Sequence, residues 1–175
     1  MNAIIAAQVI GLPLNRFITV HWERAGLTGQ DAAHATNRFL KLARDNLTSK
    51  GFPFASIWVR ENDEGDRSKG DHAHILAHVP KGQSLGRWQR GWIKNITGKP
   101  YRKSVILTRT IARHSEAAEH APNHYQLNLS ILAEYILKGA SHDAALALKL
   151  PSWRLGGKVE GQRMGMSKNL SRATR

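Results

Sequence analysis

The sequence predicts an α+β fold in which helices pack on an antiparallel β-sheet. Segments of strand character and segments of helical character follow one another in the order β-α-β-β-α-β-α. An acidic segment rich in turn-forming residues joins the second strand to the third, as in a hairpin. The chain has 175 residues, 41% of them hydrophobic, and is therefore long enough to bury one full-sized core.

Strand character comes from β-branched and aromatic residues, or from the alternation of apolar residues with others. The four predicted strands are residues 17–22, 55–60, 72–79 and 103–111. Helical character comes from apolar residues that recur every three or four positions. The three predicted helices are residues 31–48, 84–96 and 123–138. This order of elements is typical of ferredoxin-like and RNA-recognition-motif sandwiches.

The chain is strongly basic, with 26 Lys and Arg against 13 Asp and Glu and a net charge of +13. The segment from Lys81 to Arg113 holds nine basic residues and no acidic one. Such an excess is typical of a surface that binds phosphates. The residues predicted to bind nucleic acid are Lys81, Arg87, Arg90, Lys94, Lys99, Arg102, Lys103 and Arg109.

Apolar residues within this basic segment have helical spacing: Leu85, Trp88, Trp92 and Ile96. We therefore expect them to form the buried stripe of an amphipathic helix whose outer face is basic. The alternative is that the tryptophans stack on bases.

Neither disulfides nor a membrane span is expected. The chain contains no cysteine, which agrees with a cytoplasmic location. No apolar run approaches the roughly 18 residues that a membrane span requires. The apolar segment 3–14 lacks the basic start of a signal peptide and is expected to be a structured N-terminus.

Two histidines, His72 and His74, stand two residues apart in the third predicted strand. Successive side chains of a strand point to opposite faces, so this pair shares one face and can hold a divalent metal ion. The alternative is two half-exposed histidines without a metal. Five acidic residues lie between Glu61 and Asp71, where carboxylates can complete such a site, although most of them fit a solvated hairpin loop. Alternation along the second strand places Glu61 with Ile57 and Val59.

Tyr135 and Lys138 lie three residues apart on the last predicted helix, and therefore on one helix face. A nearby cation favours the phenolate form of a tyrosine, which is a stronger nucleophile than the phenol. The alternative is a tyrosine at the edge of an apolar stripe, beside a solvated lysine.

Three motifs resemble those of the HUH endonuclease superfamily, in particular the single-tyrosine initiators of rolling-circle replication. Phe17-Ile18-Thr19-Val20 is similar to the first-strand motif, His72-Ala73-His74 to the paired-histidine motif, and Tyr135-Ile136-Leu137-Lys138 to the catalytic-tyrosine motif. The motifs occur in the order of the family and extend from about Phe17 to Gly139. The resemblance implies the HUH nuclease variant of the fold over residues 1–150, followed by a basic, glycine-containing tail over residues 151–175.

The resemblance also implies a site and a reaction. His72, His74 and Glu61 would hold Mn²⁺ or Mg²⁺, with Asp63 and His78 as rival third ligands. Tyr135 would attack one phosphate of a specific single-stranded DNA site and form a 5′-phosphotyrosine link, with Lys138 stabilising charge. Such nicking and joining would start rolling-circle replication of a plasmid or phage. The chain has no G-x-x-x-x-G-K-[ST] motif, so a separate helicase is an expected partner.

Two other functions are consistent with the sequence. A single-tyrosine transposase of the same superfamily has a similar histidine motif, but commonly carries glutamine at the position that Gly139 occupies here. A non-catalytic DNA- or RNA-binding protein would use only the basic surface. The discriminating feature is whether His72, His74 and Tyr135 lie on the same face of the sheet.

Overall fold

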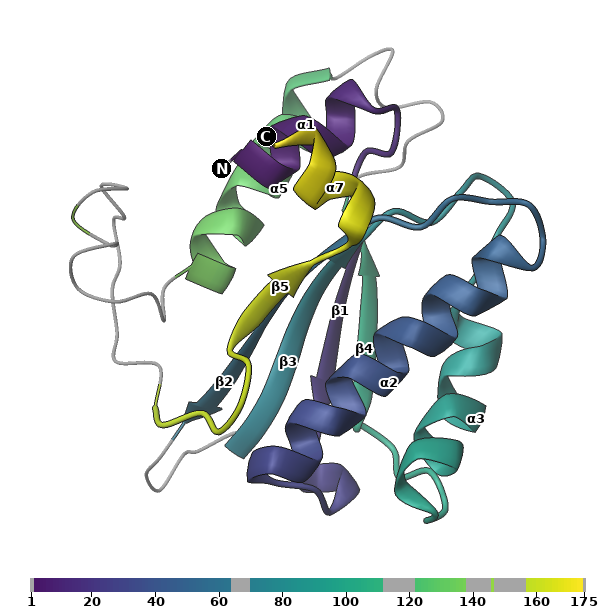
Figure 1. The fold of residues 1–175 in the computed structure, drawn as a ribbon, viewed down its shortest axis with the longest axis vertical. Helices are drawn as coiled ribbons and strands as arrows, with labels where there is room; N and C mark the ends of the chain where they lie inside the picture. Colours follow the sequence, from purple (N-terminus) through teal and green to yellow (C-terminus); the bar gives the residue numbers. More distant parts are fainter. Residues whose placement is uncertain (1, 64–69, 112–121, 138–145, 147–156, 175) are drawn as a thin grey trace.

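The structure, a computed structural model, describes residues 2–63, 70–111, 122–137, 146 and 157–174. It is an α+β fold with one five-stranded antiparallel sheet in the order β4-β1-β3-β2-β5 (Figure 1). The strands are β1 (Arg16–His21), β2 (Ser56–Asp63), β3 (Gly70–Ala77), β4 (Ile106–Thr110) and β5 (Met164–Met166). The predicted fold class is therefore confirmed.

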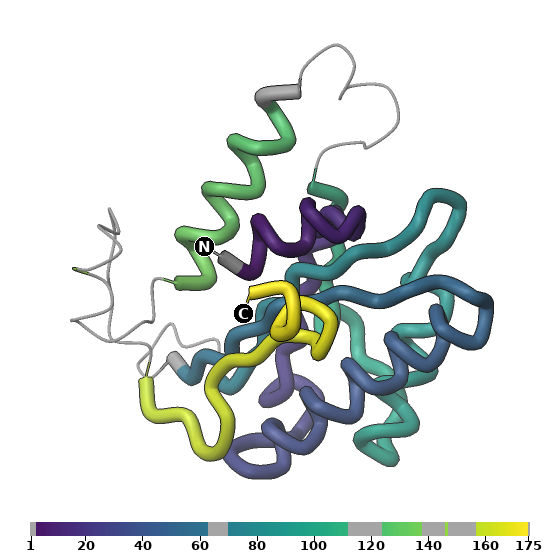
Figure 2. Tube along the Cα trace, turned by 45° about the horizontal axis from the view of Figure 1, so that its top comes forward, coloured from purple at the N-terminus to yellow at the C-terminus, as the bar shows by residue number. Residues whose placement is uncertain are grey.

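Helices cover both faces of this sheet (Figures 1 and 2). The helices are α1 (Asn2–Val9), α2 (Gly29–Thr48), α3 (Gly86–Thr97), α5 (Pro122–Leu137) and α7 (Lys168–Ala173), with a 3-10 turn η1 at Glu23–Ala25. Helices α2 and α3 pack on one face, where Ile18, Trp58 and Ile75 are buried. Helices α1, α5 and α7 pack on the other face, over Val59 and Leu76.

Alternation along each strand therefore divides its side chains between two cores. On β3, Ala73 and Ile75 enter the core under α2 and α3. Leu76 enters the core under α1, α5 and α7, and His72 and His74 share its side of the strand because they lie an even number of residues away. The histidine pair is consequently buried, with His72 0% and His74 2% exposed.

The end of the chain is part of the sheet, which corrects the prediction of a separate tail from residue 151. Strand β5 pairs with β2, and α7 follows it and packs near α1. Gly165 in β5 lies against the Trp58 indole, and a Cβ there would come within 2.9 Å of the ring. The three-residue strand is too short to show a period in the sequence, which is why it was not predicted.

Element boundaries differ from the predictions at several ends. Strand β2 continues past Arg60 to Asp63, and β4 begins at Ile106 rather than at residue 103. None of the helices in the described ranges is long and apolar enough to cross a membrane.

Candidate active site

Three side chains from two neighbouring strands form a buried cluster that could hold a metal ion. Glu61 of β2 is the direct cross-strand partner of His72 on β3, and His74 follows two residues later. One potential ligand atom from each residue lies within 4.8 Å of the others. All three side chains are buried, with Glu61 0% exposed. These are the three residues predicted as metal ligands.

Strand pairing explains how Glu61 reaches the histidines. Glu61 shares a strand face with Val59 and Ile57, as alternation predicts. Val59 is paired with His74 and Ile57 with Leu76, so this face is the one that carries the histidines. An apolar pattern identifies a strand face as buried, but it does not say which of two cores the face belongs to.

Hydrogen bonds orient both imidazoles from outside the cluster. His72 Nδ1 donates to the carbonyl oxygen of Gly70 at 2.7 Å, so Nε2 is the nitrogen with which a neutral His72 ring could bind a metal ion. This Nε2 lies 3.5 Å from Glu61 Oε2. His74 Nδ1 shares a 3.0 Å hydrogen bond with Thr19 Oγ1. Partners of this kind are typical around metal-binding histidines, and a cation between Nε2 and the carboxylate would offset the cost of burying a negative charge.

The rival third ligands do not join the described cluster. His78 lies beyond the end of β3, and its Nδ1 donates to the carbonyl oxygen of Pro13 at 2.8 Å. The Asp63 side chain lies outside the described part of the chain.

Helix α5 brings Tyr135 to the same face of the sheet as the histidine pair. The Tyr135 ring lies edge-on to His74, with ring centroids 5.0 Å apart. Phe17 stacks on His74 at 5.4 Å and contacts Tyr135 edge-on at 6.1 Å. The first-strand motif therefore contributes Phe17 and Thr19, which hold His74 and the tyrosine together. The three motifs meet on one face of the sheet.

An open pocket of about 440 Å³ lies where Tyr135 meets His74. Within the described part of the chain, no acidic residue lines it, whereas two arginines do, Arg24 and Arg109. Both arginines are exposed and can therefore reach a bound anion. The lining residues are Phe17, Thr19, His21, Arg24, His74, Leu107, Arg109, Leu132 and Tyr135.

His21 and Arg24 are pocket residues that the sequence analysis did not identify. His21 is the cross-strand partner of His72 on β1, and the two rings stack with centroids 5.6 Å apart. Arg24 lies in η1, directly after β1. The one sequence feature that could have identified them is their position shortly after the first-strand motif. A single histidine and a single arginine at such a position are not distinctive. Lys138, the predicted partner of Tyr135, lies outside the described residues.

The other two tyrosines are placed differently. Tyr101 packs against the core on the α2 and α3 face, and Arg90 lies 5.5 Å from its ring centroid. Tyr125, on α5, is buried, and its hydroxyl donates to the carbonyl oxygen of Leu14 at 2.8 Å. Burial raises the pKa of Tyr125 to about 12, from an ordinary value of 10.0. A buried phenol that holds its proton this firmly anchors α5 and is a poor nucleophile.

This anchor makes stability at high pH a test of the packing of α5. The pKa of Tyr125 is higher in the folded chain than in the unfolded chain. The contribution of this phenol to the free energy of unfolding is therefore complete below pH 10 and is lost as the pH rises towards 12. Over that range the unfolding free energy should fall by about 2 to 3 kcal/mol through this group. Urea denaturation at several pH values should show this loss in the wild type and not in Tyr125→Phe. A constant difference between the two proteins would contradict it.

The predicted nucleic-acid-binding residues are divided between the two faces of the sheet. Arg109 lines the tyrosine pocket. Arg87, Arg90 and Lys94 are exposed on α3, on the opposite face. The remaining four are exposed in the segments on either side of α3: Lys81, Lys99, Arg102 and Lys103. The structure thus separates residues that the sequence places in one stretch.

Trp88 corrects the predicted buried stripe of α3. Its side chain is 41% exposed, whereas Trp92 is 9% exposed. The described buried residues of the helix are Gln89, Trp92 and Ile93, which follow Leu85 at helical spacing. Trp88 is one position short of this stripe, so it lies at the border of the buried face.

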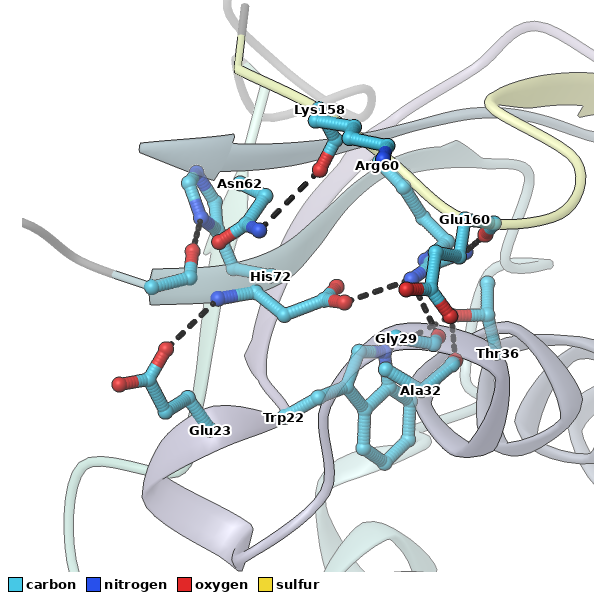
Figure 3. A network of polar contacts seen from close by, with 12 residues as sticks. Trp22, Glu23, Gly29, Ala32, Thr36, Arg60, Asn62, His72, Lys158 and Glu160 are labelled. Carbon is cyan, nitrogen blue, oxygen red and sulfur yellow. Dashed lines mark hydrogen bonds and ion pairs between the residues drawn. The ribbon is translucent and has the colours of Figure 1, made fainter. Parts of the chain in front are cut away.

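A buried ion pair fixes β3 from the opposite side of the sheet (Figure 3). Arg60 Nη2 donates to Asp71 Oδ2 at 2.6 Å and to the carbonyl oxygen of Gly29 at 2.9 Å, and Nη1 donates to that of Glu160 at 2.7 Å. Burial raises the pKa of Asp71, and the hydrogen bond from Arg60 opposes that rise. The backbone N–H of Asp71 donates to Glu23 at 3.1 Å. These contacts hold the strand directly before His72.

Comparison with known proteins finds no matching family model, no matching curated protein and no matching solved structure.

Proposed function

We propose that this protein is a metal-dependent endonuclease that nicks and rejoins single-stranded DNA through Tyr135. The observation that carries the proposal is the contact between Tyr135 and His74, a member of the Glu61, His72 and His74 cluster. Tyr135, two arginines and His74, one member of the candidate metal site, line the same pocket. A nucleophile, cations and a nearby metal site are the parts that phosphoryl transfer by a tyrosine requires.

In this proposal the chain first binds and orients one phosphodiester. Arg24 and Arg109 hold its non-bridging oxygens at the pocket, and the aromatic contacts of Phe17 fix the tyrosine ring. Tyr135 Oη loses its proton to solvent and attacks phosphorus, the bond from phosphorus to the 3′ oxygen breaks, and that oxygen takes up a proton. The products are a 5′-phosphotyrosine and a free 3′ hydroxyl, and the reverse reaction rejoins the strand.

The donor set suits a divalent transition metal. Glu61, His72 and His74 would hold the ion, and the bound ion would act as a Lewis acid on the scissile phosphate. Two imidazole ligands favour Mn²⁺ over Mg²⁺, so we expect Mn²⁺ to support the reaction at least as well. Initiation of rolling-circle replication, with a separate helicase to open the duplex, is the role that fits this chemistry.

The test is covalent capture from a pool of random single-stranded oligonucleotides. Incubation of the full chain with the pool and Mn²⁺ should give a protein–DNA adduct that survives denaturation, and sequencing of the trapped ends should identify a preferred site. The same pool in EDTA, and the pool made double-stranded, are the controls. If no single-stranded substrate gave an adduct, a non-catalytic nucleic-acid-binding protein would replace the nuclease as the proposed function.

A further inference from the structure

A second exposed surface on α3 combines cations with an unburied tryptophan. We define the α3 surface as the exposed residues Lys50, Arg87, Trp88, Arg90 and Lys94. Lys50 follows α2 and the others lie on α3, so the surface is on the sheet face opposite the tyrosine pocket. Figure 1 shows α2 and α3 side by side on that face.

Trp88 is held at this surface by cations rather than by the core. Lys50 Nζ and the Arg87 guanidinium carbon each lie 5.6 Å from the centroid of its ring. Leu85, Trp92 and Ile93 already anchor α3 to the sheet, so packing does not need this indole. A large aromatic ring that is 41% exposed and has two cations beside it is suited to stack on the base of a nucleotide whose phosphate the cations neutralise.

No carboxylate within the described ranges neutralises these cations. In α2, Asp45 forms its ion pairs with Lys41 and Arg44. Among the described residues, no ion pair reaches Lys50, Arg87, Arg90 or Lys94. The segment between Lys81 and Arg113 contains no acidic residue that could do so. The cations are therefore available to an external anion.

We propose that the α3 surface binds single-stranded nucleic acid, with phosphates on its four cations and one unpaired base stacked on Trp88. The exposed tryptophan among these cations favours a single strand over an acidic protein, because every unpaired nucleotide presents a flat base next to a phosphate. Since the tyrosine pocket lies on the other face of the sheet, a strand bound here leaves that pocket free. The chain would then hold nucleic acid at two places, and binding at this one does not depend on cleavage.

The experiment measures affinity without any cleavage. Fluorescence anisotropy of a labelled oligo(dT) is recorded in EDTA over a range of salt concentrations. The test protein carries Arg87→Glu, Arg90→Glu and Lys94→Glu. The matched control carries Lys158→Glu, Lys168→Glu and Arg172→Glu, which lowers the net charge equally through exposed residues away from α3. The salt slope is the slope of the logarithm of the affinity against the logarithm of the salt concentration. Its magnitude should decrease by about 2 in the test protein and stay near the wild-type value in the control.

Trp88→Ala supplies a second readout that does not change the charge. Loss of one stacked base should weaken oligo(dT) binding about tenfold and leave the salt slope unchanged. The ring is exposed, so the melting temperature should also stay the same. If the triple variant fails to fold, the three glutamine substitutions replace it.

Four outcomes would overturn the proposal. They are an unchanged salt slope, an equal loss in the charge-matched control, an unaltered affinity in Trp88→Ala, and displacement of the oligonucleotide by polyglutamate of the same charge. If the triple variant lost more affinity for duplex DNA than for the single strand, the α3 surface would be assigned to duplex DNA instead. Because no metal or nicking is involved, failure of the nuclease proposal would leave these results intact.

Discussion

Tyr135→Phe is expected to abolish the covalent protein–DNA adduct while leaving the fold and the affinity for single-stranded DNA unchanged. The substitution removes one oxygen, which is the atom that would attack phosphorus. The ring itself remains, and with it the contacts to His74 and Phe17. In the proposal the affinity for single-stranded DNA comes mainly from cations outside Tyr135, so the affinity should not fall when the chemistry is lost. The measurement is denaturing electrophoresis of labelled oligonucleotide after incubation with Mn²⁺.

The other tyrosines provide matched controls within the same chain. Tyr101→Phe changes a residue on the opposite sheet face and should form the adduct at the wild-type rate. Tyr125→Phe removes the hydrogen bond to Leu14 and should lower stability by about 1 kcal/mol, but it too should form the adduct. If Tyr135→Phe still formed a denaturation-resistant adduct, the nucleophile would be another residue.

The main elements of the fold could be predicted because each has a strong local period. Helix α2 carries Ala32, Phe39 and Leu47 on one buried stripe, and β1 and β3 are rich in β-branched or alternating apolar residues. What local period cannot give is which strand face meets which helix. In this protein helices cover both faces of the sheet, so a buried apolar residue such as Val59 could belong to either core. Only the structure shows that the face of Val59 is the one that carries Glu61 and the histidines.

The candidate site could be predicted only in part for the same reason. Glu61, His72 and His74 were predicted as ligands, and they do form one cluster. His21 joins the site through strand pairing with His72, and Thr19 through its hydrogen bond to His74. Such pairings depend on strand order, which brings β1 beside β3 and which no segment of the sequence encodes alone.

Trp88 shows the limit of helical periodicity. Residues 85, 88 and 92 fit a helical stripe equally well in sequence, yet the Trp88 side chain is 41% exposed, whereas Gln89 and Ile93 are buried. A stripe of period 3.6 drifts around the helix, so its border is decided by the helix it packs against, which is α2. The exposed indole therefore became visible only in the structure.

Removal of the metal ligands is expected to have the second large effect. In His72→Ala/His74→Ala, two of the three clustered donors are lost, so divalent ions should no longer stabilise the fold. For the wild type, Mn²⁺ at 100 times its Kd should add about 2.7 kcal/mol, which raises the melting temperature by about 5 to 10 °C. The double variant should show no such rise and no adduct formation, but most of its single-strand affinity should remain.

His78→Ala is the control that separates ligand loss from the loss of a buried imidazole. His78 is buried like His72 and His74, but its ring donates a hydrogen bond to the carbonyl oxygen of Pro13 and lies outside the metal cluster. Its removal should lower the melting temperature without metal, yet the increase caused by Mn²⁺ and the adduct should persist. Equal responses to Mn²⁺ in the wild type and the double variant would show that the ion binds elsewhere. Full activity of the double variant in EDTA would exclude a role for metal. It would mean that the arginines and Tyr135 suffice for the reaction.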